Sequence, residues 1–414
     1  MNFAIIGLGG RGSVYAHYIN EYGARLVAVC DINADKYSLA AKYGVSENGF
    51  FTDESEFFKR GKIADALVIS TMDGLHYEQA MRALDFGYDI LLEKPIALTL
   101  EQCKSIERKA IQTGRKVVVC HVLRYAPIYI KLKELIESKK LGDVVSLSLT
   151  EEIGYYHFAH SYVRGNWRNT DVSTPLIVAK NCHDLDIICW FLDRPCLSVS
   201  SVGGLYEFKP DKAPLSSAAR CVDCPLKEEC KYSCFKLYTN AEYEKCAGLA
   251  AHANLGRTAE EICAALGNTH TPYGRCVYRC DNNVCDHQTV NMLFDGGVTA
   301  QLLSTAFSEN ICRNSVVYFT DGKAYSLPDG NIAYEKFGGE KGTIEVEKVS
   351  GGYAHHGGGD VGIVKEFISY VQDGVKPFSI TDISRSVQSH EIAFAAEQSR
   401  LKNGKTLFMN GSEK

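Results

Sequence analysis

The stretch Phe3-Ala4-Ile5-Ile6-Gly7-Leu8-Gly9-Gly10-Arg11-Gly12 joins a short apolar run to a helix-like sequence. Its glycines have the spacing G-x-G-x-x-G, with Gly7, Gly9 and Gly12 at the three positions. The first glycine permits a tight turn, the second admits a pyrophosphate close to the backbone, and the third lets the helix pack on the strand. The stretch therefore predicts a strand, a phosphate-binding turn and a helix whose N-terminus faces the phosphates.

A carboxylate follows at the distance that dinucleotide binding requires. The apolar run 26–30 ends in Asp31, about twenty residues after the last glycine of the loop. Asp31 can accept the ribose hydroxyls and would repel a 2′-phosphate, and the next two residues, Ile32 and Asn33, supply no cation. The sequence therefore favours NAD over NADP, with Gly10 and Arg11 of the loop also beside the cofactor.

The composition is that of a soluble, mildly acidic globular protein. The chain has 414 residues, of which 45% are hydrophobic and 23% charged, and a formal net charge of −5. This length predicts two domains, and the charge argues against a nucleic-acid partner. The apolar start lacks a basic region and a cleavage site, and no run reaches membrane-spanning length. We expect a cytoplasmic protein whose 16 cysteines are thiols or metal ligands.

The first 123 residues alternate short apolar runs with helical patterns, which predicts an α/β fold with a doubly wound parallel sheet. We therefore predict an NAD-binding Rossmann domain over residues 1–123. The predicted strands cover residues 3–6, 26–30, 66–70, 89–92 and 117–121, and the predicted helices cover 11–22, 34–43, 75–87 and 99–113.

The pattern changes after Arg124. Residues 124–414 predict an α+β domain, for substrate binding and oligomerisation, on a largely antiparallel sheet with hairpins at Asp295-Gly296-Gly297 and Asp321-Gly322. A Cys-rich stretch at about 207–286 breaks this pattern and is interpreted as an insertion. The predicted strands cover 144–153, 197–206, 288–294, 298–306 and 314–320, and the predicted helices cover 127–139, 175–192, 360–373 and 381–402.

Ligands of doubly wound sheets bind at the carboxyl ends of the strands, where Thr71-Met72-Asp73 and Glu93-Lys94-Pro95 lie. Together with the glycine loop, Asp31 and the continuation to His76, these motifs resemble those of the Gfo/Idh/MocA oxidoreductases. Members of that family use NAD or NADP to oxidise or reduce a carbon of a sugar, cyclitol or related polyol. The resemblance implies that Lys94 lies beside the nicotinamide and contacts the reacting hydroxyl. It also implies that Thr71, Met72, His76 and Glu93 line the cofactor.

The segment Lys180-Asn181-Cys182-His183-Asp184-Leu185-Asp186 takes the place of the family's catalytic helix, and the resemblance maps His183 onto the catalytic histidine. Helical spacing would put Lys180, His183 and Asp184 on one face. The family's acid, four residues before the histidine, is replaced by Ala179. Lys180 can instead bind the substrate or hold His183 neutral, because a nearby cation disfavours imidazolium. We predict substrate contacts for all three polar residues and catalytic roles for Lys180 and His183.

Two further segments, 160–168 and 355–360, resemble a sugar-directed branch of the family. The predicted ligand contacts are Trp167 and Arg168 at the cofactor and His160 and His356 at the substrate. A surface loop, with Asp360 as a helix N-cap, is the alternative interpretation.

The cysteines between 221 and 234 form a C-x2-C-x5-C-x3-C array of Cys221, Cys224, Cys230 and Cys234. Four thiolates complete a closed tetrahedral shell, so a structural zinc site is the simplest prediction. Cys276 or Cys280 can replace Cys234 in that set. Unliganded thiols, a disulfide and an iron–sulfur cluster remain alternatives.

These observations predict an NAD-dependent enzyme that transfers a hydride between nicotinamide and a secondary alcohol of a sugar, glycoside or cyclitol. One alternative keeps the fold and cleaves a glycoside through a 3-keto intermediate while recycling the NAD. Another, of a different class, is a non-catalytic NAD-sensing protein. By analogy with the family we expect a homo-oligomer, either a dimer or a tetramer.

Overall fold

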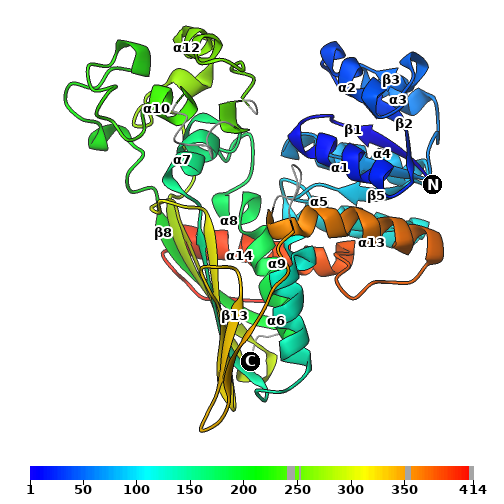
Figure 1. Ribbon diagram of the computed structural model, residues 1–414, viewed down its shortest axis with the longest axis vertical. Coiled ribbons are helices and arrows are strands. Elements are labelled where there is room, and N and C mark those ends of the chain that lie inside the picture. Colours follow the sequence, from blue (N-terminus) through cyan, green and yellow to red (C-terminus); the bar gives the residue numbers. More distant parts are fainter. Residues whose placement is uncertain (240–247, 251–252, 350–355, 410–414) are drawn as a thin grey trace.

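The computed structural model describes residues 1–239, 248–250, 253–349 and 356–409. Two sheets organise the molecule, one in the N-terminal third and one in the remainder of the chain (Figure 1). None of the helices in these described ranges is both long and apolar enough to cross a membrane.

The first sheet is parallel, with six strands in the order β3-β2-β1-β4-β5-β6. This order reverses direction between β1 and β4, and ligands of doubly wound sheets bind at that point. Its strands are almost wholly buried because helices cover both faces. The strands are β1 (Asn2–Ile6), β2 (Arg25–Cys30), β3 (Phe50–Phe51), β4 (Ala66–Ile69), β5 (Asp89–Leu92) and β6 (Val117–Val119). The helices between them are α1 (Gly10–Glu21), α2 (Tyr37–Lys42), α3 (Glu54–Lys59), α4 (His76–Asp85) and α5 (Leu100–Thr113).

A helix from the far end of the chain completes the first domain. Helix α13 (Gly359–Asp373) lies along α1 and contributes Ile363, Val364 and Phe367 to the core around β1. The rings of Phe3 and Phe367 are 6.0 Å apart. Figure 1 shows this orange helix against the blue N-terminal layer. The second domain is therefore connected to the first through packed apolar surface.

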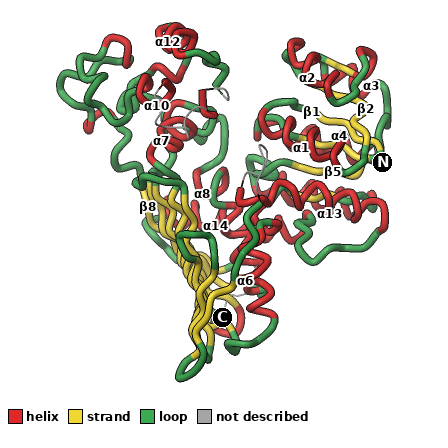
Figure 2. Tube along the Cα trace, in the orientation of Figure 1, coloured by secondary structure: helices red, strands yellow, loops and turns green. Residues whose placement is uncertain are grey.

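The second sheet has nine strands in the order β14-β13-β12-β11-β7-β10-β9-β8-β15. Only the β7–β10 pair is parallel among its described strands, so the expected, largely antiparallel sheet is confirmed. The two predicted hairpins join β9 to β10 and β11 to β12. Figure 2 shows the strands of this sheet in yellow around β8. The strands are β7 (Val144–Glu152), β8 (Cys196–Gly204), β9 (His287–Phe294), β10 (Thr299–Thr305), β11 (Cys312–Phe319), β12 (Gly322–Ser326), β13 (Ile332–Lys336), β14 (Lys341–Ile344) and β15 (Leu407–Phe408).

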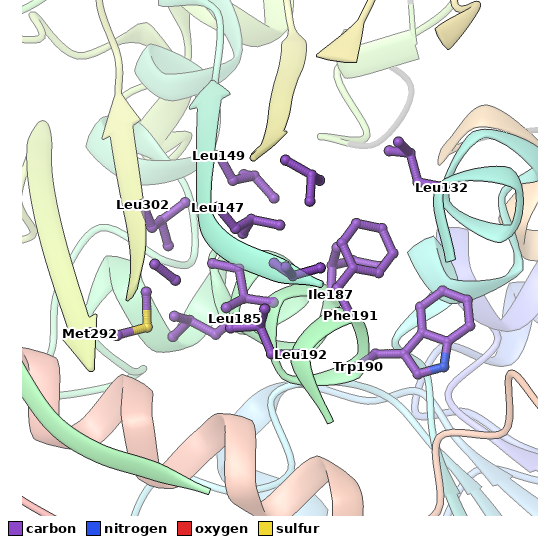
Figure 3. Packing of buried hydrophobic residues seen from close by; sticks show 14 of the residues in the cluster. Leu132, Leu147, Leu149, Leu185, Ile187, Trp190, Phe191, Leu192, Met292 and Leu302 are labelled. Carbon is purple, nitrogen blue, oxygen red and sulfur yellow. The ribbon is translucent and has the colours of Figure 1, made fainter. Parts of the chain in front are cut away.

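One face of this sheet is covered by helices and the other is open. The side chains of Leu147, Leu149 and Leu302 pack against Leu185 and Phe191 of the covering helix (Figure 3). The covering helices are α6 (Pro127–Glu137), α9 (Cys182–Leu192) and α14 (Ile383–Leu401). On the open face Val145, Leu293, Leu303 and Tyr318 are exposed. The predicted dimer or tetramer stays a prediction.

The Cys-rich segment lies between β8 and β9 and forms a subdomain of its own (Figure 1). Its apolar centre is largely aromatic and includes Phe208, Tyr232 and Tyr238. It packs on the short helix α7 (Tyr155–Phe158) and on the helical turn 159–164 that follows. Its helices are α10 (Cys234–Thr239) and α12 (Ala259–Gly267).

Candidate active site

The glycine loop has the shape that a pyrophosphate requires. Gly7 has a φ of +89°, and a Cβ on Gly12 would lie 2.0 Å from the carbonyl oxygen of Gly7. Gly9 is the N-cap of α1 and offers no side-chain cap to the free N–H groups. A Cβ on Gly9 would meet no described atom within 4 Å. Open space therefore lies above unpaired helix N–H groups, which is how a phosphate is bound.

Asp31 lies at the end of β2, where the adenosine ribose is expected. Its carboxylate accepts the N–H of Leu8 at 2.7 Å and of Asn33 at 2.9 Å. These bonds fix its orientation and leave acceptor capacity for the ribose hydroxyls. Ile32 follows with 92% of its surface exposed and offers no cation for a 2′-phosphate. The loop and Asp31 together fit NAD.

Arg11 contacts two carboxylates. Its guanidinium donates to Glu93 at 2.6 Å and to Asp360 at 2.7 Å. Burial raises the pKa of Glu93, but the cations of Arg11 and Lys94 outweigh burial and lower it overall. Arg11 therefore joins the glycine loop to the end of β5 and to the first turn of α13.

Lys94 crosses from the first domain to the second. Its Nζ donates to the carbonyl oxygen of Ala179 at 3.0 Å. That carbonyl is available because the predicted helix over 175–192 is interrupted, which corrects our prediction of one continuous helix. Helix α8 ends at Ala179, and α9 begins at Cys182. The position that lacks the family's acid thus contributes its backbone to the site.

The interruption also changes the placement of Lys180. It adopts φ −110° and ψ −54° between the two helices, so simple helical spacing does not relate it to His183. Its Nζ lies 3.2 Å from Glu151 Oε1. Burial lowers the pKa of Lys180, and the neighbouring Glu151 carboxylate opposes this effect only in part.

Glu151 and Arg313 were not predicted from the sequence. They are direct cross-strand partners on β7 and β11, and Arg313 Nε lies 2.8 Å from Glu151 Oε2 and 2.7 Å from Asp184 Oδ1. The other oxygen of Asp184 accepts from Asn181 at 2.9 Å. Asp184, predicted to bind substrate, is therefore held by two neighbours. Glu151 follows Leu147 and Leu149 on the buried face of β7, and this alternation was the available signal.

His183 is 3% exposed and lies among other basic side chains. Its ring centroid is 5.6 Å from that of His121 and 5.9 Å from that of His356. Burial, with the charge of Lys94 next in effect, holds the pKa of His183 well below its usual range. Its Nδ1 has no hydrogen-bond partner among the described residues. Burial therefore favours the neutral form of the His183 ring, whose Nδ1 lacks a partner among the described residues.

His121 and His157 were also missed. His121 lies two residues beyond the end of β6, so the strand-end rule could have identified it. His157 lies in α7, and the depressed pKa of its ring reflects burial together with Lys180, His160 and Lys94. No pattern in the sequence singled out His157.

The loop after β4 connects the two domains a second time. Trp167 Nε1 donates to Asp73 Oδ2 at 3.1 Å, and Ser173 donates to the same oxygen at 2.9 Å. Met72 is partly exposed beside Asn166. The ring of His76 is buried between the carbonyls of Thr71 and Pro95, and it links the ends of β4 and β5.

Two residues that were predicted to contact the substrate or cofactor form contacts with side chains of the insertion. His160 stacks on Tyr273 at 4.8 Å and bonds to Tyr238. Arg168 forms a bidentate pair with Asp281, at 2.8 and 3.0 Å. His356, by contrast, lies near His183 and bonds to Asp360 at 3.0 Å. Its neighbour His355 lies outside the described residues.

Residues 1–121 match the family model described as "Oxidoreductase family, NAD-binding Rossmann fold", GFO_IDH_MocA. The N-terminal domain therefore matches the NAD-binding domain of the Gfo/Idh/MocA oxidoreductases. It is 25% identical to the putative oxidoreductase YteT of Bacillus subtilis over 75% of this chain and 73% of that protein. It is 26% identical to an inositol 2-dehydrogenase of Klebsiella pneumoniae over 48% of this chain, and the match spans only 56% of that relative.

Solved structures share the whole fold. An Agrobacterium radiobacter oxidoreductase in complex with NAD+, L-tartaric acid and magnesium has a TM-score of 0.71 and 14% identity, and the match covers 99% of this chain and 98% of that one. The WlbA dehydrogenase of Chromobacterium violaceum in complex with NADH and UDP-GlcNAcA has a TM-score of 0.67 and 14% identity. That match covers 100% of this chain and 97% of the other. The family model thus identifies an NAD-binding Rossmann domain of the oxidoreductase family, and the solved structures show that their fold extends over the whole chain.

Proposed function

We propose that this enzyme oxidises or reduces a secondary alcohol of a sugar, glycoside or cyclitol, with NAD as the hydride carrier. The observation that supports this most directly is the Lys94–Ala179 contact. It brings the lysine at the end of β5 to the start of the segment that carries His183. Proton-handling side chains of both domains thereby meet beside the strand ends where the nicotinamide belongs.

When bound, NAD accepts the hydride that leaves the carbinol carbon. The accompanying hydroxyl proton needs an acceptor, and His183 is suited to it because burial keeps its imidazole neutral. Lys94 donates hydrogen bonds only, so it can hold the substrate oxygen while the carbonyl forms. In the reverse direction the same residues return the proton to the new hydroxyl.

Lys180 directly follows Ala179, and the ring centroid of His356 is 5.9 Å from that of His183, so both residues are proposed to contact further substrate hydroxyls. Glu151 pairs with Lys180 and opposes the effect of burial on its charge, and Asp360 orients His356 through Nδ1. A polyol needs several such donors and acceptors. The inositol 2-dehydrogenase among the relatives favours a substrate rich in hydroxyl groups.

The test is a screen of aldoses, uronates, cyclitols and aryl glycosides with the wild-type enzyme and NAD. We expect NADH absorbance with at least one polyol. Release of the aglycone from a glycoside without accumulation of NADH would instead identify the NAD-recycling cleavage reaction. Absence of both reactions across the screen, with NAD bound, would contradict the proposal.

A further inference from the structure

The insertion contains a cavity of about 220 Å³ whose wall carries four cysteines. Cys221, Cys224 and Cys230 come from one segment, and Cys276 comes from another. Cys234, the fourth residue of the sequence array, is fully buried and does not line this cavity. The lining of the cavity therefore favours Cys276 over Cys234 as the fourth ligand, a choice that the sequence left open.

Backbone pairing brings the two segments together. Arg220 and Arg275 form an antiparallel bridge, and the N–H of Cys276 donates to Ala219 at 2.9 Å. Cys221 and Cys276 each follow a bridged residue and therefore lie on the same face of the pair. Cys224 is returned toward Cys221 by a turn, in which its N–H donates to the carbonyl of Cys221 at 3.2 Å.

A buried cation that forms no ion pair with a carboxylate of the described residues lies on the same cavity. Arg164 is 0% exposed, and its guanidinium donates to two carbonyls and, at 3.8 Å, to Cys221 Sγ. Its Nη1 has no hydrogen-bond partner among the described residues. A buried charge requires a counter-charge, and the Cys221 thiol, which contacts the guanidinium, is an acidic group that can provide part of it. Thiolates around a divalent ion leave a net negative charge and would supply it.

We propose that Cys221, Cys224, Cys230 and Cys276 bind one structural Zn²⁺, with Arg164 as the buried cation that balances the thiolate shell. In the described residues no three Cys, His, Asp or Glu side chains are yet arranged around a common point. Each cysteine has a single rotatable side-chain bond with three staggered positions, so binding gathers the sulfurs by side-chain rotation. Four thiolates leave no open position on the ion, so the centre is structural.

This zinc centre would also be connected to the active site through the chain that follows Arg164. Arg164 ends the helical turn 159–164 and is followed by the loop that carries Trp167. Trp167 in turn donates to Asp73 of the first domain. An ion bound beside Arg164 would therefore stabilise the start of this connection.

Elemental analysis of the full-length protein, purified without chelator, tests the proposal. We expect close to one zinc per chain in the wild type. Cys224→Ser and Cys276→Ser should lose it, whereas the matched controls Cys234→Ser and Cys280→Ser should keep it. Cys276→His should retain zinc, because imidazole can replace a thiolate.

A second measurement does not depend on the folding of any variant. Titration of the native wild type with a thiol-modifying mercurial, followed with a metallochromic indicator, should release the zinc as the ligand thiols react. The proposal is overturned if zinc-supplemented wild type contains no zinc, or if it contains iron with visible absorption instead. It is equally overturned if Cys234→Ser loses zinc while Cys276→Ser keeps it.

Discussion

Arg124 and Asp186 form an ion pair from which solvent is excluded. Their side chains are 1% and 0% exposed, and two parallel N–H···O bonds of 2.6 Å join them. Removing one partner of such a pair leaves the other charge buried and uncompensated. Asp186→Asn should therefore lower the free energy of unfolding by about 3–5 kcal/mol. Urea unfolding measures this change.

The control is Lys139→Ala, which removes an exposed pair with Asp143. Exposed pairs contribute little, so its unfolding curve should overlie that of the wild type. Equal decreases in the free energy of unfolding of both variants would show that burial does not increase the contribution of the Arg124–Asp186 pair.

His390 predicts how stability depends on pH. Its Nδ1 donates to the carbonyl of Ser386 and its Nε2 accepts the N–H of Ile96, so the neutral ring is built into the fold. Burial lowers its pKa to about 3. The unfolded chain therefore binds one more proton between about pH 6.5 and pH 3, and stability falls as the pH falls through that window.

The contribution of His390 is about 1.4 kcal/mol for each pH unit within the window. His390→Gln removes this proton, so its stability, measured by urea unfolding between pH 7 and 4, should fall less steeply than that of the wild type. An unchanged slope would show that His390 is not held neutral in the folded protein.

At the scale of elements, two glycines of the loop have different predicted roles. Gly12 is needed for packing, and Gly9 is needed for NAD binding. A Cβ on Gly12 would press on the Gly7 carbonyl at 2.0 Å, whereas a Cβ on Gly9 meets nothing within 4 Å. Gly12→Ala should therefore lower the melting temperature. Gly9→Ala should keep it and still weaken NAD binding about tenfold or more, because the methyl occupies the phosphate space.

Calorimetric titration with NAD, with a thermal melt of each variant, checks this pair. Wild-type NAD affinity in Gly9→Ala would show that the pyrophosphate does not lie over the loop.

The first sheet was largely predictable because its buried strands are continuous apolar runs between helical patterns. The edge strand β3 was missed because two residues, Phe50 and Phe51, carry no periodicity. Strands β12 to β14 were missed because polar residues dominate their exposed faces, for example in Gly322–Ser326. Local patterns thus reveal buried strands and not short or half-exposed ones.

The site was predictable where it depends on motifs and not where it depends on pairing. Lys94 and His183 follow from short motifs, and the structure brings their segments together. The Glu151–Arg313 pair depends on the register between β7 and β11, which lie far apart in the sequence. The helix interruption at Lys180 was hidden because no proline or glycine marks it.

At the scale of the molecule, the contacts that join the domains around the site include three side-chain hydrogen bonds. Lys94 reaches Ala179, Trp167 reaches Asp73, and Arg11 reaches Asp360. Each has one partner at the carboxyl edge of the first sheet or in the glycine loop. The site is therefore shared between the domains, and Lys94 is the residue that each model of its chemistry requires.

Turnover of Lys94→Ala, compared with its NAD affinity, tests this account most directly. Loss of a hydrogen-bond donor to a reacting oxygen costs about 10²–10³-fold, so NADH formation with the substrate found in the screen should fall by that factor. Calorimetry should give nearly wild-type NAD affinity, and Lys59→Ala, which changes an exposed lysine on α3, should leave both quantities unchanged. Undiminished turnover in Lys94→Ala would contradict the account.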